Sequence, residues 1–187
     1  MRVEGRGFRR KKKKRRKGIN PFAFTLEVIV KRNYLLFVLT VLVIIVLDQI
    51  TKIYIDTHMT LHETIPVVNG FFNITYVRNP GAAFGFLADA SPFLRALFLI
   101  GVSFFASGLI VYYIIRMKTE DILLTYGMSL ILGGAVGNLI DRIRLGEVID
   151  FLDVYISTYH WPAFNVADSA VSVGAVILFY KLIKGQV

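Results

Sequence analysis

The sequence predicts an all-α membrane protein: a four-transmembrane-helix bundle with a small β-sheet or loop subdomain on its outer face. Three observations support this fold class: the composition, four long apolar segments, and a strand–turn–strand pattern between the first two of them. The chain of 187 residues is 55% hydrophobic and holds 15 Phe residues, which is too apolar for an ordinary soluble domain. A membrane core about 30 Å thick requires roughly 20 helical residues to cross it. Four segments reach or approach this length: Tyr34–Ile55, Phe93–Ile115, Ile122–Ile140 and Ala163–Tyr180.

The connection between the first two apolar segments, residues 57–91, is long enough to fold by itself. Its apolar runs Ile65–Val68 and Phe71–Val77 are separated by Asn69 and Gly70, a two-residue turn that is typical of β-hairpins. We therefore expect a small sheet in this region, at the boundary between the outer membrane surface and water.

Basic residues are concentrated ahead of the first apolar segment. Residues 1–32 hold 13 of the 22 Lys and Arg residues, including an uninterrupted run at Arg9–Lys17. The net charge of +9 thus reflects a basic cytoplasmic arm, expected to be disordered, and not the membrane domain predicted for residues 33–187. Lys and Arg mark the cytoplasmic side of membrane helices and are attracted to anionic lipid headgroups. We expect membrane lipids, and no nucleic acid, as partners of the arm.

The positive charges also set the topology. The arm places the N-terminus in the cytoplasm, and four crossings return the C-terminus to the same side. Arg116 and Lys118 in the second connection, and Lys181 and Lys184 after the fourth segment, then fall on the cytoplasmic side as well.

This topology brings the carboxylates that accompany the membrane segments into one layer. The first and third segments run outward and carry aspartates near their outer ends, while the fourth begins at the outer side. Ionisable groups at membrane depth are costly and indicate a functional site. The aspartates of this layer are Asp48, Asp141, Asp150, Asp153 and Asp168.

Each aspartate also has a simpler structural interpretation. Asp48 can form an ion pair with Lys52, four residues later on the same helix face. Asp141 ends a helix and can face water or headgroups, and Asp153, in the second outer loop with Asp150, is more often solvated than catalytic. Asp168 lies about one turn inside an apolar segment, so it needs a partner or a proton.

A pair of carboxylates is the simplest catalytic chemistry that these residues support. The chain has no Cys and no Gly-x-Ser-x-Gly motif, although a Ser–Lys pair that uses Lys52 stays open. His58 and His62 have helical spacing but no evident third ligand, so we expect neither a metal nor another cofactor. Two aspartates close together cannot both ionise easily, so one keeps a proton and the other activates water.

Five motifs, in this order, resemble the bacterial lipoprotein signal peptidases, the signal peptidase II family. The resemblance spans roughly residues 34–184 and leaves the basic arm outside. The motifs are Asp48–Lys52, Asn79–Gly85, Gly133–Arg142, Val148–Phe151 and Phe164–Asp168.

The resemblance implies a membrane aspartyl endopeptidase of the bacterial cytoplasmic (inner) membrane, with its active site at the outer (periplasmic) face. Its substrates would be diacylglyceryl-modified prolipoproteins, cleaved on the N-terminal side of the lipidated cysteine. By the same resemblance, Asp150 and Asp168 are the catalytic pair. The substrate-binding or supporting positions that it implies are Asn79, Gly81, Asn138, Arg142, Asn165, Asp48, Lys52 and Asp141.

Two other classes of function are considered from the sequence. A small proton- or ion-coupled transporter would also bury carboxylates, although the inner halves of the segments are almost purely apolar. A non-catalytic membrane subunit could use the same polar residues for assembly. The sequence determines neither the oligomeric state nor the substrate preference, nor which aspartate of the pair holds the proton.

Overall fold

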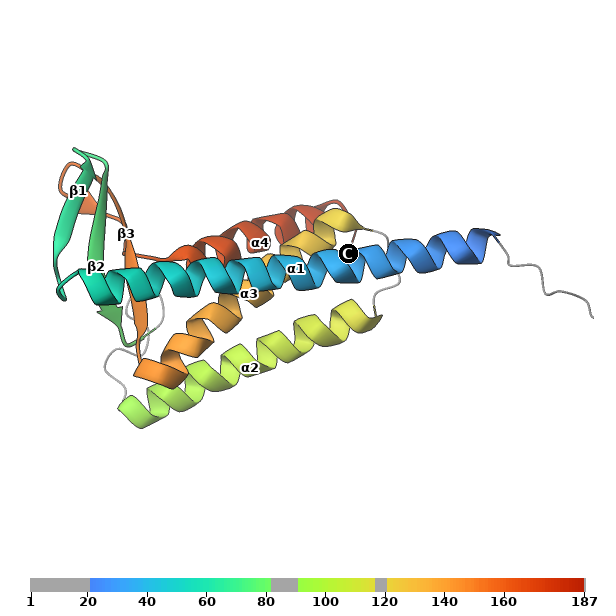
Figure 1. Cartoon of the computed structure of the whole chain (residues 1–187), viewed down its shortest axis with the longest axis horizontal. Coiled ribbons are helices and arrows are strands. Elements are labelled where there is room, and N and C mark those ends of the chain that lie inside the picture. The colour runs from blue at the N-terminus through green and yellow to red at the C-terminus, as the bar shows by residue number, and fades with distance from the viewer. Residues whose placement is uncertain (1–20, 82–90, 117–120, 187) are drawn as a thin grey trace, which may run out of the picture.

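The computed structural model describes residues 21–81, 91–116 and 121–186, with side chains from residue 33 onward except that of residue 92. Within these ranges, four helices form a bundle and a small antiparallel sheet lies across one end of it (Figure 1). The helices are α1 (Pro21–His58), α2 (Pro92–Arg116), α3 (Ile122–Leu145) and α4 (Val166–Ile183). The strands are β1 (Thr64–Val68), β2 (Phe72–Asn79), β3 (Val148–Ile156) and β4 (Tyr159–His160).

Each of the four helices contains a stretch that is long and apolar enough to cross a membrane. This confirms the predicted bundle with its small sheet. The spans are Asn33–His58, Phe93–Arg116, Ile122–Leu145 and Val166–Ile183. Helix α1 begins at Pro21, a residue suited to a first helical turn, so it includes residues 21–32, which the sequence analysis assigned to the arm. Residues 1–20 of the arm lie outside the described residues.

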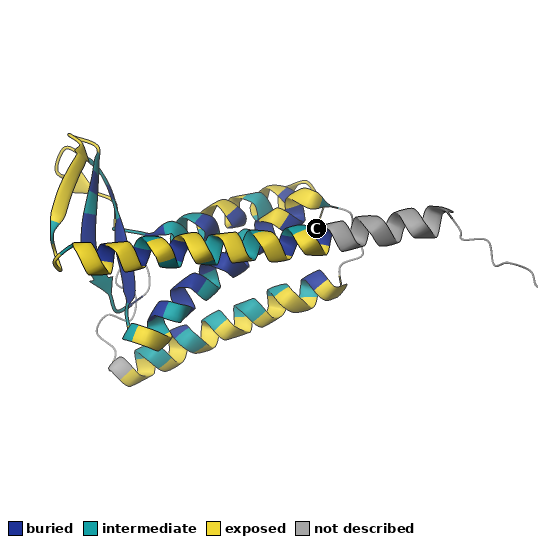
Figure 2. Ribbon diagram, viewed as in Figure 1, coloured by how far each residue is buried: buried dark blue, intermediate teal, exposed yellow. Residues whose placement is uncertain are grey.

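Helix α3 is the centre of the bundle and contacts the other three helices. It is 61% buried over its most apolar stretch, compared with 11% for α1. Figure 2 shows the difference: exposed residues run along α1 and α2, whereas α3 is largely buried. The exposed apolar faces are those that a helix turns toward lipid tails, where no polar side chain is needed.

Glycines let α3 approach its neighbours at backbone distance. A Cβ atom at Gly133 or Gly137 would collide with α1, the latter 2.6 Å from Asp48 Oδ2. On another face of α3, a Cβ at Gly134 would lie 2.3 Å from the carbonyl oxygen of Ala167 in α4. Small residues at helix interfaces allow such contact in membranes, so these glycines serve packing.

The sheet has the order β1-β2-β3-β4. The predicted hairpin forms β1 and β2, and Gly70 in its turn adopts a φ of +81°, which suits glycine. The segment with Asp150 and Asp153, which we expected to be a loop, is instead strand β3 and pairs with β2. This expectation was wrong because β3 acquires its pairing partner from a distant part of the chain.

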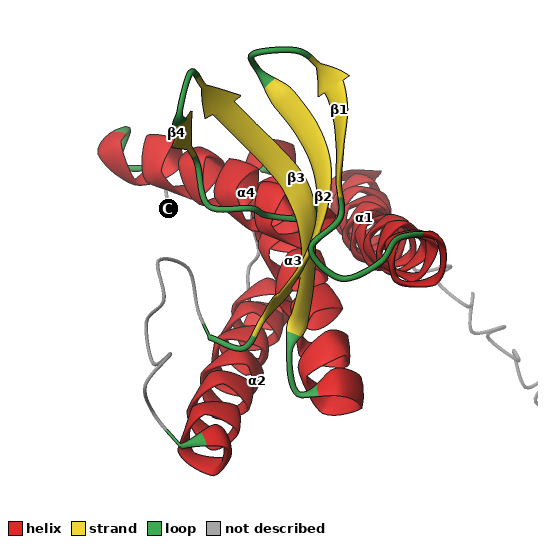
Figure 3. Ribbon diagram, turned by 90° about the vertical axis from the view of Figure 1, so that its left-hand side faces the viewer, coloured by secondary structure: helices red, strands yellow, loops and turns green. Residues whose placement is uncertain are grey.

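Figure 3 shows how the strands stand across the end of the helices. A buried apolar cluster of Ile55, Tyr76, Ile149 and Phe151 joins α1 to β2 and β3. The sheet is therefore attached to the bundle by its own core, and polar residues on β2 and β3 are held against the helix ends.

Replacing Gly134 with Ala should lower the stability of the bundle, because the new methyl group meets the backbone of α4. Overpacking of this kind costs about 1–3 kcal/mol, which thermal unfolding in detergent micelles would detect. The matched control is Gly101→Ala on α2, where an added Cβ has no atom within 4 Å. Equal unfolding temperatures for the two variants would contradict the close packing of α3 on α4.

Candidate active site

Polar side chains from three helices and two strands meet where the helices reach the sheet. Helices α1 and α3 contribute their ends near the sheet, β2 and β3 contribute strand residues, and α4 contributes its first turn. The residues brought together include all the site residues that the sequence predicted: Asp48, Lys52, Asn79, Gly81, Asn138, Asp141, Arg142, Asp150, Asn165 and Asp168.

The ammonium group of Lys52 is the centre of this cluster. Its Nζ lies 2.9 Å from Asp48 Oδ2 and 2.9 Å from Asp141 Oδ2, and it donates a hydrogen bond of 2.8 Å to Asn138 Oδ1. Three acceptors match the three donors of an ammonium group. The side chains of Lys52, Asp48 and Asp141 are at most 1% exposed. Asp141 therefore does not face water or headgroups as the sequence suggested, because Lys52 compensates it inside the protein.

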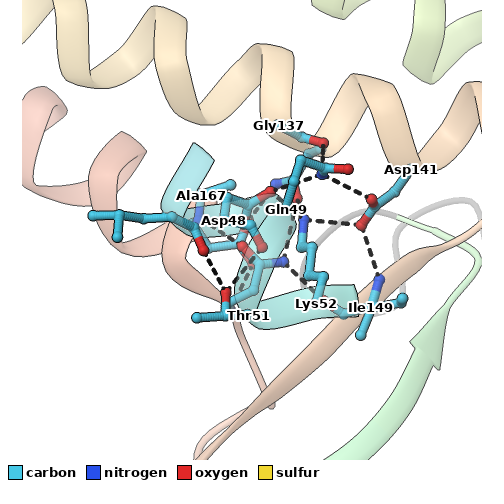
Figure 4. A network of polar contacts seen from close by, with 12 residues as sticks. Asp48, Gln49, Thr51, Lys52, Gly137, Asp141, Ile149 and Ala167 are labelled. Atoms are coloured by element: carbon cyan, nitrogen blue, oxygen red, sulfur yellow. Dashed lines mark hydrogen bonds and ion pairs between the residues drawn. The ribbon is translucent and has the colours of Figure 1, made fainter. Parts of the chain in front are cut away.

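One lysine cannot neutralise two carboxylates. Backbone amides, which are neutral donors, stabilise the negative charge that remains. Asp48 Oδ1 accepts from the Ala167 amide at 2.9 Å, in the first turn of α4, where the helix dipole is positive. Asp141 Oδ2 accepts from the Ile149 amide of β3 at 3.3 Å. These two contacts tie α1 to α4 and α3 to β3 (Figure 4).

Gln49 also belongs to this network, although no role was predicted for it from the sequence. Its Nε2 donates to Asp48, to the Gly137 carbonyl and to Asp141 at 3.1–3.2 Å. Its position beside Asp48 in the Asp48–Lys52 motif was the available signal, but neighbouring helix residues do not normally face the same partner.

Helix α4 begins with a reciprocal cap. Asn165 Oδ1 accepts from the Asp168 amide at 2.8 Å, and Asp168 Oδ2 accepts from the Asn165 amide at 3.2 Å. Such a box satisfies two amides that have no partner within the helix. The helix therefore starts at Val166 rather than at the predicted Ala163, and Asp168 lies in its first turn.

The same contacts orient two amide side chains. Because Asn165 Oδ1 is occupied by the cap, its Nδ2 points at Asp150 Oδ1, 2.7 Å away. Because Asn138 Oδ1 accepts from Lys52, its Nδ2 points at Asp168 Oδ1, 2.8 Å away. Each aspartate thus receives an N–H from an amide that cannot turn over without losing its other bond.

Asn79, at the end of β2, provides a second donor to Asp150. Its Oδ1 accepts from the Gly81 amide at 3.0 Å, and its Nδ2 donates to Asp150 Oδ2 at 2.9 Å. Asp150 therefore receives one N–H on each oxygen.

The pKa of Asp150 is nevertheless raised above the usual value of an aspartate. Its burial, with 2% of the residue exposed, and the nearby negative charge of Asp168 raise its pKa to about 7, against the lowering effect of Asn79 and Asn165. Desolvation disfavours the ionised form of a carboxyl group, as does a neighbouring carboxylate. With a pKa of about 7, part of the Asp150 population still carries its proton near neutral pH.

A cavity of about 850 Å³ opens beside Asp150 and Asp168. Polar groups line one side of it, including Asn138 and the guanidinium-bearing Arg142, whose Nη1 lies 3.5 Å from the Asn138 carbonyl oxygen. Its other walls are mostly apolar and come from the segment 161–164 and from α4. Apolar walls with a few convergent polar groups are typical of a substrate site.

Asp153 lies outside this cavity. It is buried, accepts from Asn73 Nδ2 at 2.8 Å and contacts His160 Nδ1 at 2.8 Å. The expectation of a solvated Asp153 was wrong, because β2 and β4 cover it on either side of β3. Its contacts tie these strands together.

The described residues contain no group of three or more His, Cys, Asp or Glu side chains that could hold a metal ion. His58 Nδ1 instead lies 3.0 Å from the Tyr54 carbonyl oxygen and 2.8 Å from the Thr57 hydroxyl, both on its own helix.

The chain is similar to known proteins over most of its length. Residues 40–184 match the family model described as signal peptidase (SPase) II. A protein named lipoprotein signal peptidase from Syntrophus aciditrophicus is 53% identical over 156 residues, which cover 83% of this chain and 97% of that protein. Its namesake from Geobacter sulfurreducens is also 53% identical, over 83% of this chain and 96% of its own.

Two solved structures of bacterial membrane enzymes share the fold. The first, at 2.3 Å resolution, is 34% identical with a TM-score of 0.72 and covers 79% of this chain and 87% of its own. The second, at 1.9 Å, is 32% identical with a TM-score of 0.72 and covers 79% of this chain and 92% of its own.

Replacing Lys52 with Met should destabilise the protein strongly, because two buried carboxylates lose their shared counter-charge. Removing one partner of a buried ion pair typically costs about 3–5 kcal/mol. Thermal unfolding in detergent would measure this loss, with Lys184→Met, at an exposed position near the opposite end of the bundle, as the control. An unfolding temperature equal to that of the control would show that Lys52 does not hold the cluster together.

Proposed function

The chain belongs to the signal peptidase II family, and from this premise we propose that Asp150 and Asp168 are its catalytic pair. The protein is a membrane aspartic peptidase that removes signal peptides from prolipoproteins. Membership of this family supports hydrolysis in place of the transporter that the sequence left open.

The observation that carries the assignment is the unequal environment of two carboxyl groups on one cavity. Asp150, from β3, has a pKa raised to about 7, while Asp168, from α4, lies at the positive end of a helix and accepts an amide N–H on each oxygen. Paired acids whose environments differ in this way divide the roles of acid and base between them.

In the proposed reaction, the Asp168 carboxylate takes a proton from a water molecule, whose oxygen attacks the scissile carbonyl carbon. The proton on Asp150 polarises the carbonyl oxygen and stabilises the negative charge that develops there. The carbon–nitrogen bond then breaks, and the proton held by Asp168 passes to the leaving amine. No acyl-enzyme forms.

The polar residues around the pair have supporting roles in this proposal. Asn138 orients Asp168, Asn165 orients Asp150, and Asn79 supports Asp150. Arg142, a cation on the cavity wall, would bind a backbone carbonyl of the substrate. Gly81, whose amide orients Asn79, would let the substrate backbone approach closely.

We infer the substrate and its orientation from the family and from the charges. We assign cleavage to diacylglyceryl-modified prolipoproteins, on the N-terminal side of the lipidated cysteine, with the apolar signal helix against the bundle. Arg116, Lys181 and Lys184 lie at the ends of α2 and α4 away from the sheet, which supports a cytoplasmic location of those ends. The sheet and the active site would then lie at the outer face of the cytoplasmic membrane.

The basic arm would contact anionic lipid headgroups on the cytoplasmic side. The family match begins at residue 40 and leaves the arm outside. A cluster of Lys and Arg next to a membrane helix is attracted to anionic lipids at about 1 kcal/mol per residue.

Replacing either Asp150 or Asp168 with Asn should lower kcat by about a thousandfold or more, because the acid or the base is lost. Purified variants would be tested on a synthetic diacylglyceryl prolipoprotein peptide. Asp153→Asn is the matched control, since Asp153 is also a buried aspartate of β3 but lies outside the cavity. Normal cleavage by Asp150→Asn or Asp168→Asn would refute the assignment.

The activity should fall as the pH rises through about 7, the pKa of Asp150. The pKa of this acid is raised, so its proton is retained below that pH and lost above it, and the pair then carries two negative charges. A profile of kcat/KM against pH, in detergent of constant composition, would measure this alkaline limb. Activity that stays constant to pH 9 would mean that Asp150 acts in its ionised form.

A further inference from the structure

We propose that Tyr76, Asp56 and Arg78 are positioning residues that hold Asn79 against Asp150 by fixing a bulge in strand β2. The inference rests on the proposed function, because it concerns the amide that supports Asp150. None of the five motifs contains Asp56, Tyr76 or Arg78.

The bulge lies in the pairing of β2 with β3. Ile74 pairs with Leu152, and the next pair is Val77 with Asp150. Two residues of β2, Thr75 and Tyr76, therefore stand opposite the single residue Phe151. Both Thr75 and Tyr76 are buried, which breaks the alternation of a regular strand. A bulge of this kind redirects the side chains beyond it and is common beside active sites.

The backbone of Tyr76 bonds to the segment that follows α1 instead of to β3. Its amide donates to the Glu63 carbonyl at 2.9 Å, and its own carbonyl accepts from the His62 amide at 2.8 Å. The residue is 4% exposed and packs in the cluster with Ile55, Ile149 and Phe151. The bulged residue is thus held between α1 and the sheet.

The Tyr76 hydroxyl completes a closed set of polar contacts. It donates to Asp56 Oδ1 in the last turns of α1 and accepts from Arg78 Nε at 2.8 Å. Arg78 Nη2 lies 2.7 Å from the same Asp56 oxygen. These contacts connect the end of α1 to the bulge and to the residue directly before Asn79.

The bulge decides which way Asn79 faces. Beyond it, Arg78 pairs with Ile149 and Asn79 with Val148, and in this register Asn79 Nδ2 reaches Asp150. A slip of one residue moves every side chain of a strand to the opposite face. Without the bulge, Asn79 would turn away from Asp150.

These contacts are poorly suited to a purely stabilising role. The side chains of Arg78 and Asp56 are 25% and 34% exposed, and ion pairs with such exposure add little to stability. Neither Asp56 nor Tyr76 lines the cavity, so these two cannot act by touching the substrate there. Their effect on catalysis would pass through Asn79.

The test begins with Tyr76→Phe, which keeps the ring and removes the hydroxyl. We expect kcat on the lipopeptide to fall by about tenfold to a hundredfold, the loss that a displacement of about 1 Å produces, with KM changed by less than about twofold. The control is Tyr155→Phe, since the Tyr155 hydroxyl accepts from the Gly70 amide at the hairpin turn of the same sheet. The control should keep its activity.

A pH profile distinguishes the loss of Asn79 positioning from a general loss of structure. The groups that face Asp150 are Asp168 from α4, Lys52 from α1 and Arg142 from α3, and Tyr76→Phe changes none of them. Loss of the Asn79 hydrogen bond removes a contact that favours ionised Asp150, so the alkaline limb of kcat/KM should move to higher pH. A structural defect would lower activity at every pH without moving the limb.

A double-mutant cycle with Asn79→Ala provides the decisive comparison. In the Asn79→Ala background, Tyr76→Phe should cost less than about twofold, because the group it positions is already gone. Asp56→Asn, at an exposed helix position where folding is not at risk, should behave in the same way. Full activity of Tyr76→Phe and Asp56→Asn, or losses that add to that of Asn79→Ala, would overturn the proposal.

Results that reject the proposed function differ from results that reject only the positioning role. In that case Asp150→Asn would cleave the substrate normally, whatever the behaviour of the Tyr76 and Asp56 variants. Loss of activity in Asp150→Asn together with a normal Tyr76→Phe would retain the catalytic pair and reject only the positioning role.

Discussion

The site depends on one buried ammonium group. Lys52 contacts Asp48 on its own helix and Asp141 and Asn138 on α3, and the two carboxylates extend these contacts to α4 and β3. Charges removed from water need partners in good geometry, because desolvation is expensive. The elements that carry Asp150 and Asp168 are therefore held to the same centre, which lies beside this proposed catalytic pair.

The arrangement around Lys52 also orients the amides that face the two aspartates. Lys52 sets the direction of the Asn138 amide, and the helix cap sets that of the Asn165 amide. Both amides then direct N–H groups at the carboxylates. What separates the aspartates is position: Asp168 lies at the start of a helix, where negative charge is favoured, while Asp150 lies in a buried strand whose surroundings favour its proton. A polar centre preorganised in this way needs little rearrangement during reaction.

Glycines on α3 leave space for these charged side chains while they allow the helices to pack closely. Gly137 leaves the space that Asp48 occupies, and Gly134 brings α3 against the backbone of Ala167, the residue whose amide binds Asp48. The outward faces of the helices remain apolar and exposed, as lipid requires. The glycines of α3 thus allow the burial of Asp48 as well as the close packing of the helices.

The sequence by itself determined the features that depend on neighbouring residues. Length and apolar character predicted the four spans, Asn69 and Gly70 predicted the hairpin, and helical spacing predicted the pairing of Asp48 with Lys52. The direction of each span placed the aspartates at one end of the bundle. Ordered motifs identified the family, because they record residue identity in sequence order.

Only the tertiary structure decided the features that join distant parts of the chain. These include the strand around Asp150, the sharing of Lys52 between Asp48 and Asp141, the burial of Asp153 and the bulge at Tyr76. The raised pKa of Asp150 was also decided there, since it depends on burial and on a carboxylate from another element. Hydrogen bonding and desolvation act through space. A pattern of neighbouring residues therefore does not predict which distant group will be the partner of a polar side chain.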